Sequence, residues 1–529
     1  MRFLSVNSDS FLIELGDLQH TMQLYRHLRD AAHPHIREMV PAAATILVYF
    51  NPLQITARAL IHWIKAQKPS ADTQSNHRHI EIEVCYDGPD LPHVAELLNL
   101  SVKEVIERHI QAPWQVAFIG FAPGFGYLSR ADQPFGSVPR LDSPRKKIQS
   151  GSVALAGEYS GIYPKDSPGG WQLIGQTTCK MWDLTREHPA LLLPGDQVQF
   201  IDVTHRPTHV AVHDVDLKTA DVAQSELLPV LEVLQAGLQT LIQDEGRKHV
   251  AAMGVGAAGA MDRAAYHLAN QIVGNRPDAA ALEVLNGGVK FKVLAPTVVA
   301  VTGAQSNIWV IDRNAVRSRV SGYTAFALDP KDMLQIDPPQ AGIRNYLAVR
   351  GGVATAHVLG SASYDTLAEL GPAPLQVHDL ICVGNAAVSA VELYAQAPEQ
   401  LAKVGEVIEI DVVLGPRTDW FEPESIQQFF KQQWQVTHES NRVGLRLKAP
   451  HGLKRQIQQE LPSEGTCTGA LQIPPNGQPV LFMNDHPLTG GYPVLAAVAT
   501  HDLNKVAQIP PGAFIQFRQF THVLDLDAE

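Results

Sequence analysis

Arginine side chains occur within two residues of glycine or proline at several points of the sequence. They are Arg145 in "SPRKKIQSG", Arg247 in "QDEGRKH", Arg350 in "AVRGG" and Arg446 in "GLRL". A guanidinium can hold a carboxylate or a phosphate through two parallel hydrogen bonds, which an ammonium cannot. A solvated charge run is the usual explanation for a cluster such as the one at Arg145, and Arg350 could equally cap a strand end or pair with an acid.

The stretch "GIYPKDSPGGWQLIG" (161–175) could be a phosphate cradle, the rim of a ligand site or a tight barrel turn. Gly169 and Gly170 permit positive φ or close backbone approach, and Trp171 resumes a strand. A phosphate-binding P-loop needs G-x-x-x-x-G-K-[ST], which the sequence lacks. A barrel turn and a ligand rim both remain open.

A second glycine motif, "GVGAAG" (254–259), fits the dinucleotide fingerprint G-x-G-x-x-G. Strand-like "HVAAM" precedes it, and the acids Asp278 and Glu283 lie about 20 residues beyond. The fingerprint requires a parallel βαβ sheet, whereas the following sequence alternates and is punctuated by turns, which is typical of antiparallel sheet. Dinucleotide binding is therefore a minor alternative.

His109 ends a helix that a capping box, Ser101 and Glu104, is predicted to begin. A positive charge at a helix C-terminus is favoured by about 0.3–1 kcal/mol, and this explanation is slightly preferred to acid–base catalysis. No Ser-His-Asp or metal-cluster spacing stands out, so no metal-ligating residues are predicted.

Composition restricts the class of protein. A length of 529 residues implies roughly three or four domains, and the formal net charge of −12 argues against a broad nucleic-acid-binding face.

The four cysteines are far apart, which fits a reduced setting better than a disulfide framework or a zinc site. No apolar run approaches membrane-spanning length and no signal peptide is evident, so we expect a soluble cytoplasmic protein without a membrane or nucleic-acid partner.

The chain divides into four expected regions. Residues 1–85 alternate strand and helix signals and predict a small α+β domain, whereas 86–220 predict a β-barrel after one or more helices. A first β-rich part is expected over 229–390, and a second β-barrel over 391–529. The overall prediction is a mainly β protein with an α+β N-terminal domain.

An internal repeat supports two related barrels. "SPGGWQLIG" resembles "LTGGYPVLA" (488–496), and each is followed by a Pro-Gly turn and a strand, "PGDQVQF" and "PGAFIQF". Each is also preceded by a glycine-led apolar run, "GSVALAG" and "GALQIPP". Three similarities in one order predict a duplicated barrel unit.

Longer motifs carry a family resemblance. "FIGFAPGFGYL" (118–128), "SPRKKIQSGSVALAG" and "GIYPKDSPGGWQLIGQT" resemble the subunit-1 family of allophanate hydrolase, which includes the kinase inhibitor KipI and the B subunit of 5-oxoprolinase. "QDEGRKHVAAMGVGAAGAMDRAAYHLANQIVGN", "GIRNYLAVRGGVA", "GLRLKAP" and "GALQIPPNGQPVLFMNDHPLTGGYP" resemble the subunit-2 family, which includes the C subunit of 5-oxoprolinase and the KipI antagonist KipA. The chain resembles a fusion of the two proteins in the order B then C.

The resemblance implies cyclophilin-like β-barrels in both halves, and strands rather than a helix over 230–247. It also implies ATP-dependent opening of 5-oxoproline to glutamate, with ATP and Mg²⁺ as cofactors and a separate A subunit as partner. The alternatives are a regulator of a sensor histidine kinase and a component of a urea or allophanate pathway. A homo-oligomer is possible.

The resemblance also assigns roles to residues inside its motifs. Arg145, His109, Asp244 and Glu464 are predicted to be catalytic, although Asp262, another acid in these motifs, could simply cap a helix. The residues predicted to bind substrate or nucleotide are Gly124, Phe125, Tyr127, Ser152, Tyr163, Gly169, Gly170, Trp171, Arg247, Asp262, Arg350, Arg446, Asp485, Thr489, Gly490, Gly491 and Tyr492. The aromatic members are more often barrel core than ligand stackers.

Two departures from the subunit-2 pattern matter. "GSASYDT" (360–366) has Ala362 where the family usually has Arg, so an anion contact from that Arg is in doubt. "HPLTGGYP" has Pro487 and Leu488 where the family usually has Gln and Thr.

Overall fold

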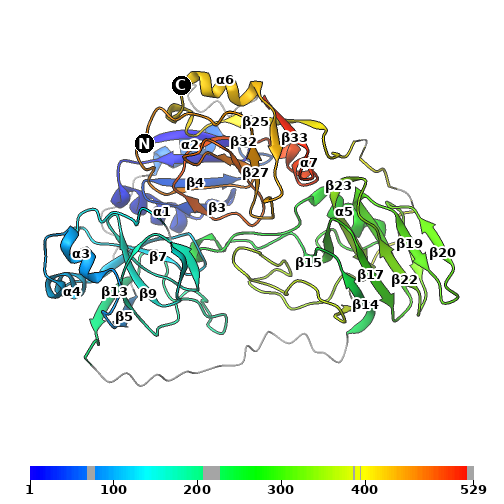
Figure 1. The fold of residues 1–529 in the computed structure, drawn as a ribbon, viewed down its shortest axis with the longest axis horizontal. Coiled ribbons are helices and arrows are strands. Elements are labelled where there is room, and N and C mark those ends of the chain that lie inside the picture. Colours follow the sequence, from blue (N-terminus) through cyan, green and yellow to red (C-terminus); the bar gives the residue numbers. More distant parts are fainter. Residues whose placement is uncertain are drawn as a thin grey trace.

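The structure is a computed structural model that describes residues 1–67, 78–143, 145–205, 227–384, 386, 388–393, 395–398 and 400–520. It is mainly β, with four modules arranged as Figure 1 shows. Within these residues, no helix has both the length and the apolar character needed to cross a bilayer.

The N-terminal module is one antiparallel sheet with two helices on one face. Its strands have the order β1-β2-β4-β3. The elements are β1 (Arg2–Asn7), β2 (Ser10–Glu14), α1 (Leu18–Ala31), β3 (Ile36–Pro41), β4 (Thr45–Phe50) and α2 (Ala57–Ala66). Asp17 and Thr56 cap the two helices, whose apolar sides pack with Phe11, Ile46 and neighbouring sheet residues.

The next module, barrel one, is a seven-stranded sheet with the order β12-β9-β10-β7-β6-β13-β5. An isolated bridge between Cys85 and Gln176 brings the end of β5 back to β12 and nearly closes the barrel. Its elements are β5 (His79–Val84), α3 (Leu91–Leu97), α4 (Val102–Ile110), β6 (Trp114–Ile119), β7 (Gly126–Ser129), β9 (Ser152–Ala156), β10 (Tyr159–Ile162), β12 (Gln172–Gln176), β13 (Gln197–Asp202) and the hairpin β8 (Arg145–Ile148) with β11 (Ser167–Gly169).

The third module is a sandwich of two antiparallel sheets around one apolar core. The six-stranded sheet, in the order β20-β19-β22-β17-β14-β24, contains β14 (Leu228–Ala236), β17 (Val289–Val293), β19 (Ile308–Ile311), β20 (Arg317–Val320), β22 (Met333–Ile336) and β24 (Leu380–Val383). The five-stranded sheet, in the order β15-β16-β23-β18-β21, contains β15 (Gln239–Gln243), β16 (Ala281–Leu285), β18 (Thr297–Gln305), β21 (Phe326–Leu328) and β23 (Ala341–Val349). The short helix η2 (Ala251–Met253) and α5 (Arg263–Ile272) come between β15 and β16, and α5 covers the five-stranded sheet.

The fourth module, barrel two, is a closed barrel with the order β25-β32-β29-β30-β27-β26-β33. Its elements are β25 (Val407–Leu414), η3 (Thr418–Trp420), α6 (Pro423–Lys431), β26 (Trp434–Val436), β27 (Gly444–Lys448), β28 (Glu464–Gly465), β29 (Ala470–Gln472), β30 (Val480–Phe482), β31 (Thr489–Gly490), β32 (Val494–Val498), η4 (Thr500–Asp502), α7 (Leu503–Val506) and β33 (Phe514–Gln519).

The predicted duplication is confirmed by strand order. Starting from β32, barrel two runs β32-β29-β30-β27-β26-β33-β25, which repeats the order of barrel one strand for strand. In both barrels the first and last strands pair in parallel, β5 with β13 and β25 with β33. The hairpin of β8 and β11 has its counterpart in β28 and β31.

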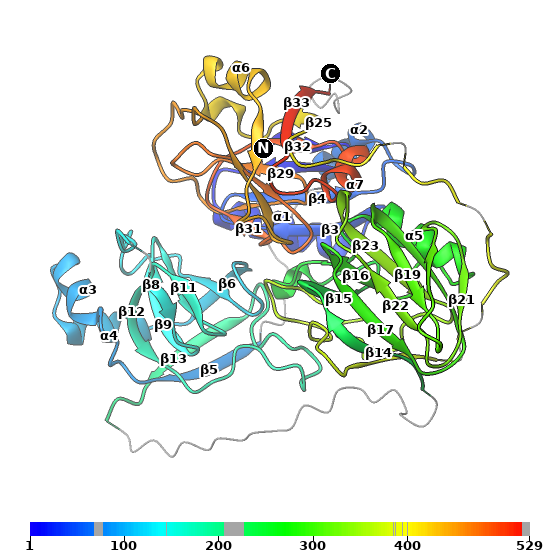
Figure 2. The ribbon, with the colours of Figure 1, turned by 45° about the vertical axis from the view of Figure 1, so that its right-hand side comes forward.

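The N-terminal sheet does not lie alone in front of barrel one. Its second face packs on barrel two, where Val40 and Leu47 contact a cluster that includes Phe482 and Val494. Figures 1 and 2 both show the blue N-terminal strands against the orange strands of barrel two. The N-terminal module, which belongs to the B-like half in sequence, therefore packs against barrel two of the C-like half.

The structure places β5, from the end of the region 1–85, in the barrel-one sheet, where it pairs with β13. The capping box at Ser101 and Glu104 is present, and 230–247 holds strands rather than a helix, as the resemblance implied.

The dinucleotide alternative is wrong. "HVAAM" forms η2 rather than a strand, the loop 254–259 is followed by a helix that begins only at Arg263, and the neighbouring strands β15 and β16 are antiparallel.

Candidate functional site

The outer faces of the two barrels differ at matching positions. The Asp90 N–H donates to the Leu173 carbonyl in barrel one, as the Arg417 N–H donates to the Val494 carbonyl in barrel two, so Leu173 and Val494 are equivalent. The face around Val494 is apolar and covered by the N-terminal sheet. The face around Leu173 is aromatic and borders an open cleft.

This cleft has a volume of about 1250 Å³ and is walled by three parts of the chain. The start of α1 and the turn at Ala43 and Ala44 form one wall, the outer face of barrel one forms the second, and residues 460–463 before β28 form the third. Single small-ligand pockets occupy roughly 300–1,000 Å³. The cleft is thus large enough for a small ligand with space left over.

The aromatic cluster on this side of the cleft contains several predicted binding residues. Tyr127 lines the cleft and stacks on Phe118 at 4.3 Å, and Phe125, Tyr163 and Trp171 belong to the same cluster. Gly169 lies beside the Tyr163 hydroxyl, where a Cβ would clash with it. The glycines at this turn therefore leave space for an aromatic side chain of the wall.

Hydroxyl groups of the wall lie near a basic residue that was not predicted, Arg140. Burial raises the pKa of Tyr127, while the Arg140 charge and a hydrogen bond with Ser463 oppose that rise. Burial likewise raises the pKa of Tyr163 to about 12, with Arg140 among the opposing charges. Both phenols are therefore neutral hydrogen-bonding groups at physiological pH.

A second assembly, the motif junction, forms where the loops 118–128, 250–261, 360–371 and 483–492 meet. The Gly124 N–H donates to the Met253 carbonyl at 3.0 Å, and a Cβ on Gly120 would collide with Thr489. Gly254, at φ +78°, has no room for a Cβ beside Ile119. Motifs from both halves thus pack directly on one another.

The glycine-rich stretch 161–175 reaches the same assembly. The Lys165 ammonium donates to the Leu367 carbonyl at 2.9 Å and lies 3.5 Å from Glu369. The two charges in this stretch therefore have structural partners, because Asp166 pairs with Lys147 at 2.8 Å.

Buried charges hold the motif junction together. Arg442 makes two hydrogen bonds to Asp485, of 2.8 and 2.9 Å, and one of 2.6 Å to Glu283 in the sandwich. Although burial opposes ionisation, Arg442 and Arg344 keep the pKa of Glu283 below its usual value. Arg442 was not predicted, yet it links barrel two to the sandwich, as do Gln508 and Asn484 through their own hydrogen bonds.

The loop 360–371 is held by two further acids. Asp244 accepts hydrogen bonds from the Ser361 and Ser363 hydroxyls and from the Ala362 N–H. Burial and the neighbouring Asp485 raise the pKa of Asp365 to about 6. Ala362 itself is fully buried in the sandwich core, so the position of the usual family Arg is apolar here.

Arg145 and Glu464, both predicted to be catalytic, occupy equivalent positions. Arg145 pairs with Gly169 across its hairpin, as Glu464 pairs with Gly490. Arg145 holds Asp90 through two hydrogen bonds of 2.7 and 2.9 Å, and Glu464 holds Arg417. The two barrels thus contain one ion pair with its charges exchanged, which favours a structural role for both residues; their catalytic role remains a prediction.

The other predicted arginines do not converge. Arg247 is buried and donates to the carbonyls of Val358, Ser363 and Leu370. Arg350 donates to the Val273 carbonyl at the end of α5, and Arg446 is exposed on β27. No shared anion pocket connects them within the described residues.

The remaining predicted residues are divided among other contacts. Asp262 is the N-cap of α5, as the simpler explanation expected. Ser152 lies in β9, and Gly170 accepts a hydrogen bond from Leu141. Thr489 and Gly490 form β31, and Gly491 and Tyr492 follow it. Tyr492 is exposed and has the Arg455 guanidinium 5.5 Å from its ring.

His109 is a core residue. Its ring is fully buried, bonded to the Tyr86 hydroxyl at 2.7 Å and to the Ser160 hydroxyl at 2.8 Å. It stacks on Phe200, and the Trp114 indole donates to its carbonyl, just as Phe429 stacks on Phe517 and accepts from Trp434. Burial lowers the pKa of His109 to about 3, so the prediction of a charge at the helix end is wrong.

The substitution His109→Phe should change the pH dependence of stability. The folded-state pKa lies below the usual value, so the stability due to neutral His109 is present above about pH 6.5 and is lost as the pH falls toward 3. Between about pH 5.5 and 4.5, the natural chain should lose about 1.4 kcal/mol more unfolding free energy than the variant. Urea titrations at several pH values measure both slopes, and equal slopes would contradict a buried neutral imidazole.

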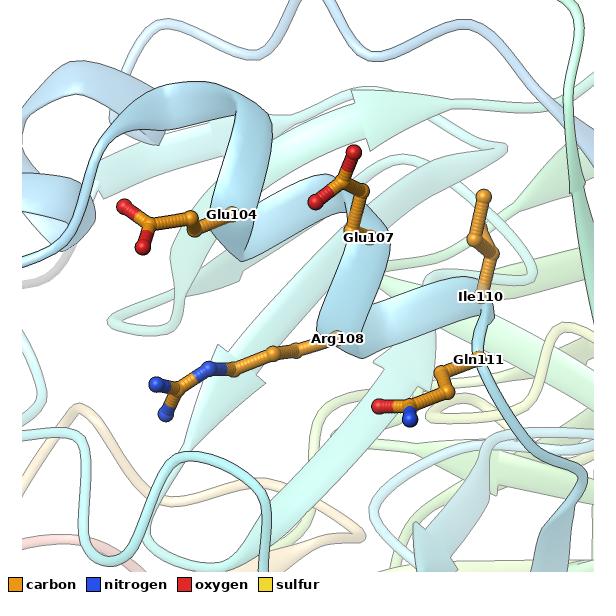
Figure 3. Close-up of a pocket in the computed structure, with 5 residues that line it drawn as sticks. All are labelled: Glu104, Glu107, Arg108, Ile110 and Gln111. Carbon is orange, nitrogen blue, oxygen red and sulfur yellow. The ribbon is translucent and has the colours of Figure 1, made fainter.

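The outer side of α4 forms a shallow depression lined by Glu104, Glu107, Arg108, Ile110 and Gln111 (Figure 3). Glu104 belongs to the capping box and Arg108 donates to the Pro134 carbonyl, so these side chains already serve the helix and its neighbouring loop. We assign no function to this depression.

The described residues do not fit a Mg²⁺ site held by the protein. One group of three ligand-type residues, Asp411, His501 and Asp502, lies close enough together. Mg²⁺ prefers oxygen ligands in octahedral geometry, but the Asp411 oxygens face Arg518 and His501, and Asp502 accepts from the Asp411 N–H. These groups already satisfy one another.

Comparison with known proteins identifies the family. The model of the carboxyltransferase domain, subdomains A and B, matches residues 253–519, and that of subdomains C and D matches residues 1–192. The chain belongs to the carboxyltransferase-domain family. It is 36% identical to the C subunit of 5-oxoprolinase from Escherichia coli (strain K12), over 55% of this chain and 91% of that protein.

Other members of the carboxyltransferase-domain family match one half or the whole chain. The B subunit of 5-oxoprolinase from Escherichia coli O157:H7 is 38% identical over 36% of this chain and 87% of that protein. Urea amidolyase of Lachancea kluyveri is 31% identical over 54% of this chain but only 17% of that protein. The crystal structure of TTHA0988 superposes with a TM-score of 0.82 at 30% identity, covering 96% of this chain and 99% of that one. These matches confirm the predicted fused B-and-C arrangement and its barrels.

Proposed function

We propose that the chain is the combined B and C component of an ATP-dependent 5-oxoprolinase, which opens 5-oxo-L-proline to L-glutamate together with a separate A subunit. The observation that carries this proposal is coverage. One chain spans 91% of a 5-oxoprolinase C protein and 87% of a B protein, with the B-like part first. The motif junction and the N-terminal sheet join the two parts into one body.

The chemistry of the proposed reaction sets what the protein must supply. A lactam carbonyl is a poor electrophile, and transfer of the γ-phosphoryl group of ATP to its oxygen, with release of ADP, would activate the carbonyl carbon for attack by water. The ring C–N bond would then break, with the nitrogen taking up a proton to become the amine of glutamate, and a second water would release phosphate from the remaining acyl phosphate. Such a reaction depends chiefly on positioning and charge stabilisation. Arg140 in the cleft offers positive charge for positioning an anionic substrate, whereas the charge of Arg145 is matched by Asp90.

Reconstitution tests the proposal. The purified chain is mixed with an A subunit, ATP, Mg²⁺ and 5-oxo-L-proline, and glutamate is measured enzymatically. We expect glutamate only when both proteins and ATP are present, and little or none from the chain alone. Absence of glutamate from the complete mixture would refute the proposal.

The likeness to urea amidolyase supports a second candidate, a part in carboxyl transfer to urea. Its test replaces 5-oxoproline by urea and bicarbonate, with a biotin carboxylase and a biotin carrier supplied, and measures urea-dependent ATP use. The regulatory alternative stays a prediction, and autophosphorylation of candidate sensor kinases with and without the chain would test it.

A further inference from the structure

The cleft beside barrel one contains charges that are already matched and others that are not. Arg130 pairs with Asp132 at 2.6 Å, Glu158 accepts a hydrogen bond from Gln133, and Asp17 caps α1 and faces His20. Among the described residues, no ion pair is formed by the other charged side chains of the cleft, which are Arg26, Arg140 and Glu460. These three are available to a ligand.

Arg140 is the best placed of the three. It is exposed and lines the same cleft as Tyr127 and Ser463, and its charge acts on the Tyr127 phenol. Arg26 instead donates through its Nε to the Met22 carbonyl of its own helix at 3.1 Å. A guanidinium, a phenol and an aliphatic hydroxyl in one place provide several donors for an oxyanion.

We propose that Arg140, Tyr127 and Ser463 form a receptor for the carboxylate of a small organic acid in the cleft. Its identity as 5-oxo-L-proline rests on the proposed function, and the receptor deepens that function by giving the substrate a place. Glu460, at the third wall, can accept the lactam N–H of such a ligand.

The receptor needs both halves of the chain. Tyr127 and Arg140 belong to the B-like half, whereas Ser463 comes from the segment before β28, which is attached to the N-terminal module by a hydrogen bond from the Ala43 N–H to the Ser463 carbonyl at 3.1 Å. In barrel two, the N-terminal sheet covers the matching face. The receptor is therefore specific to barrel one.

Calorimetric titration of the full chain tests the receptor with two probes, 5-oxo-L-proline and 2-pyrrolidinone, which lacks the carboxylate. We expect Arg140→Gln to weaken 5-oxo-L-proline binding by about 10- to 100-fold and Tyr127→Phe by about 3- to 10-fold, from the loss of charged or neutral hydrogen bonds. Neither variant should change the binding of 2-pyrrolidinone. The control is Arg319→Gln, an exposed arginine on β20 of the sandwich, which should bind both probes as the natural chain does.

Three results would overturn the receptor: no binding of 5-oxo-L-proline to the natural chain, unchanged binding to Arg140→Gln, or equal weakening for both probes. The reconstituted assay separates this proposal from the proposed function. Glutamate release with an unchanged KM in Arg140→Gln would refute the receptor alone. Carboxylate-dependent binding through Arg140 without any glutamate release would refute the 5-oxoprolinase function alone.

Discussion

Replacing Arg442 by methionine should lower the free energy of unfolding by about 3–5 kcal/mol. The Arg442 side chain is almost fully buried and neutralises two acids, Asp485 of barrel two and Glu283 of the sandwich. Methionine fills much of the same space but leaves both carboxylates buried without this partner. The expected loss is therefore that of an uncompensated buried charge rather than of one hydrogen bond.

Urea titration followed by tryptophan fluorescence measures this loss. The matched control is Arg518→Met, which removes an exposed arginine bonded to Glu409 and Asp411 and should leave the unfolding midpoint unchanged. Because Arg442 joins two modules, its variant should also unfold less cooperatively, with separate transitions for barrel two and the sandwich. An Arg442→Met midpoint equal to that of the control would contradict the role assigned to the network.

Reversing the charge of Arg145 should destabilise barrel one, and a second reversal should restore it. Arg145→Glu places a carboxylate against Asp90 and should cost about 2 kcal/mol, since the pair is largely buried. Adding Asp90→Arg reproduces the arrangement that Arg417 and Glu464 form in barrel two. The double variant should recover at least half of the lost unfolding free energy. Recovery should be incomplete because a guanidinium at position 90 cannot accept the hydrogen bond that the Leu173 N–H donates to Asp90.

A double-mutant cycle measures the coupling, which should exceed about 1 kcal/mol. The same variants test the predicted catalytic role of Arg145 in the reconstituted assay. If Arg145 serves only the ion pair, activity should return with stability in the double variant. Recovered stability with activity still absent would show that the guanidinium itself is needed for the reaction.

Much of the fold followed from local sequence. The repeated Gly-Gly-aromatic turns predicted two related barrels, and Ser101 with Glu104 predicted a helix start, because turn and cap chemistry depend on neighbouring residues. The pairing of β5 with β13 was not predictable, because β5 ends at Val84 and β13 begins only at Gln197, with 112 residues between them. The cover that the N-terminal sheet provides for barrel two depends on contacts still more distant in sequence.

The candidate site was predicted only in part. Tyr127 and its aromatic neighbours were found because glycines accompany them; Tyr127 lines the cleft, and Phe125, Tyr163 and Trp171 pack in the cluster behind it. Arg140 was passed over in favour of Arg145, although both lie in one short basic stretch, because nothing in the sequence tells a guanidinium with a buried partner from one without. Arg442 was missed for the same reason, since its two acids lie in distant segments.

The N-terminal sheet belongs to the B-like half in sequence but packs on barrel two of the C-like half. This arrangement has a consequence for how such proteins assemble. If the two halves were separate polypeptides, each would expose an apolar surface to water until it bound the other. Their complex would also dissociate on dilution. Covalent linkage fixes the ratio at one to one and makes this association independent of protein concentration. Fusion therefore secures the geometry of the cleft, whose third wall would otherwise be supplied by a different molecule.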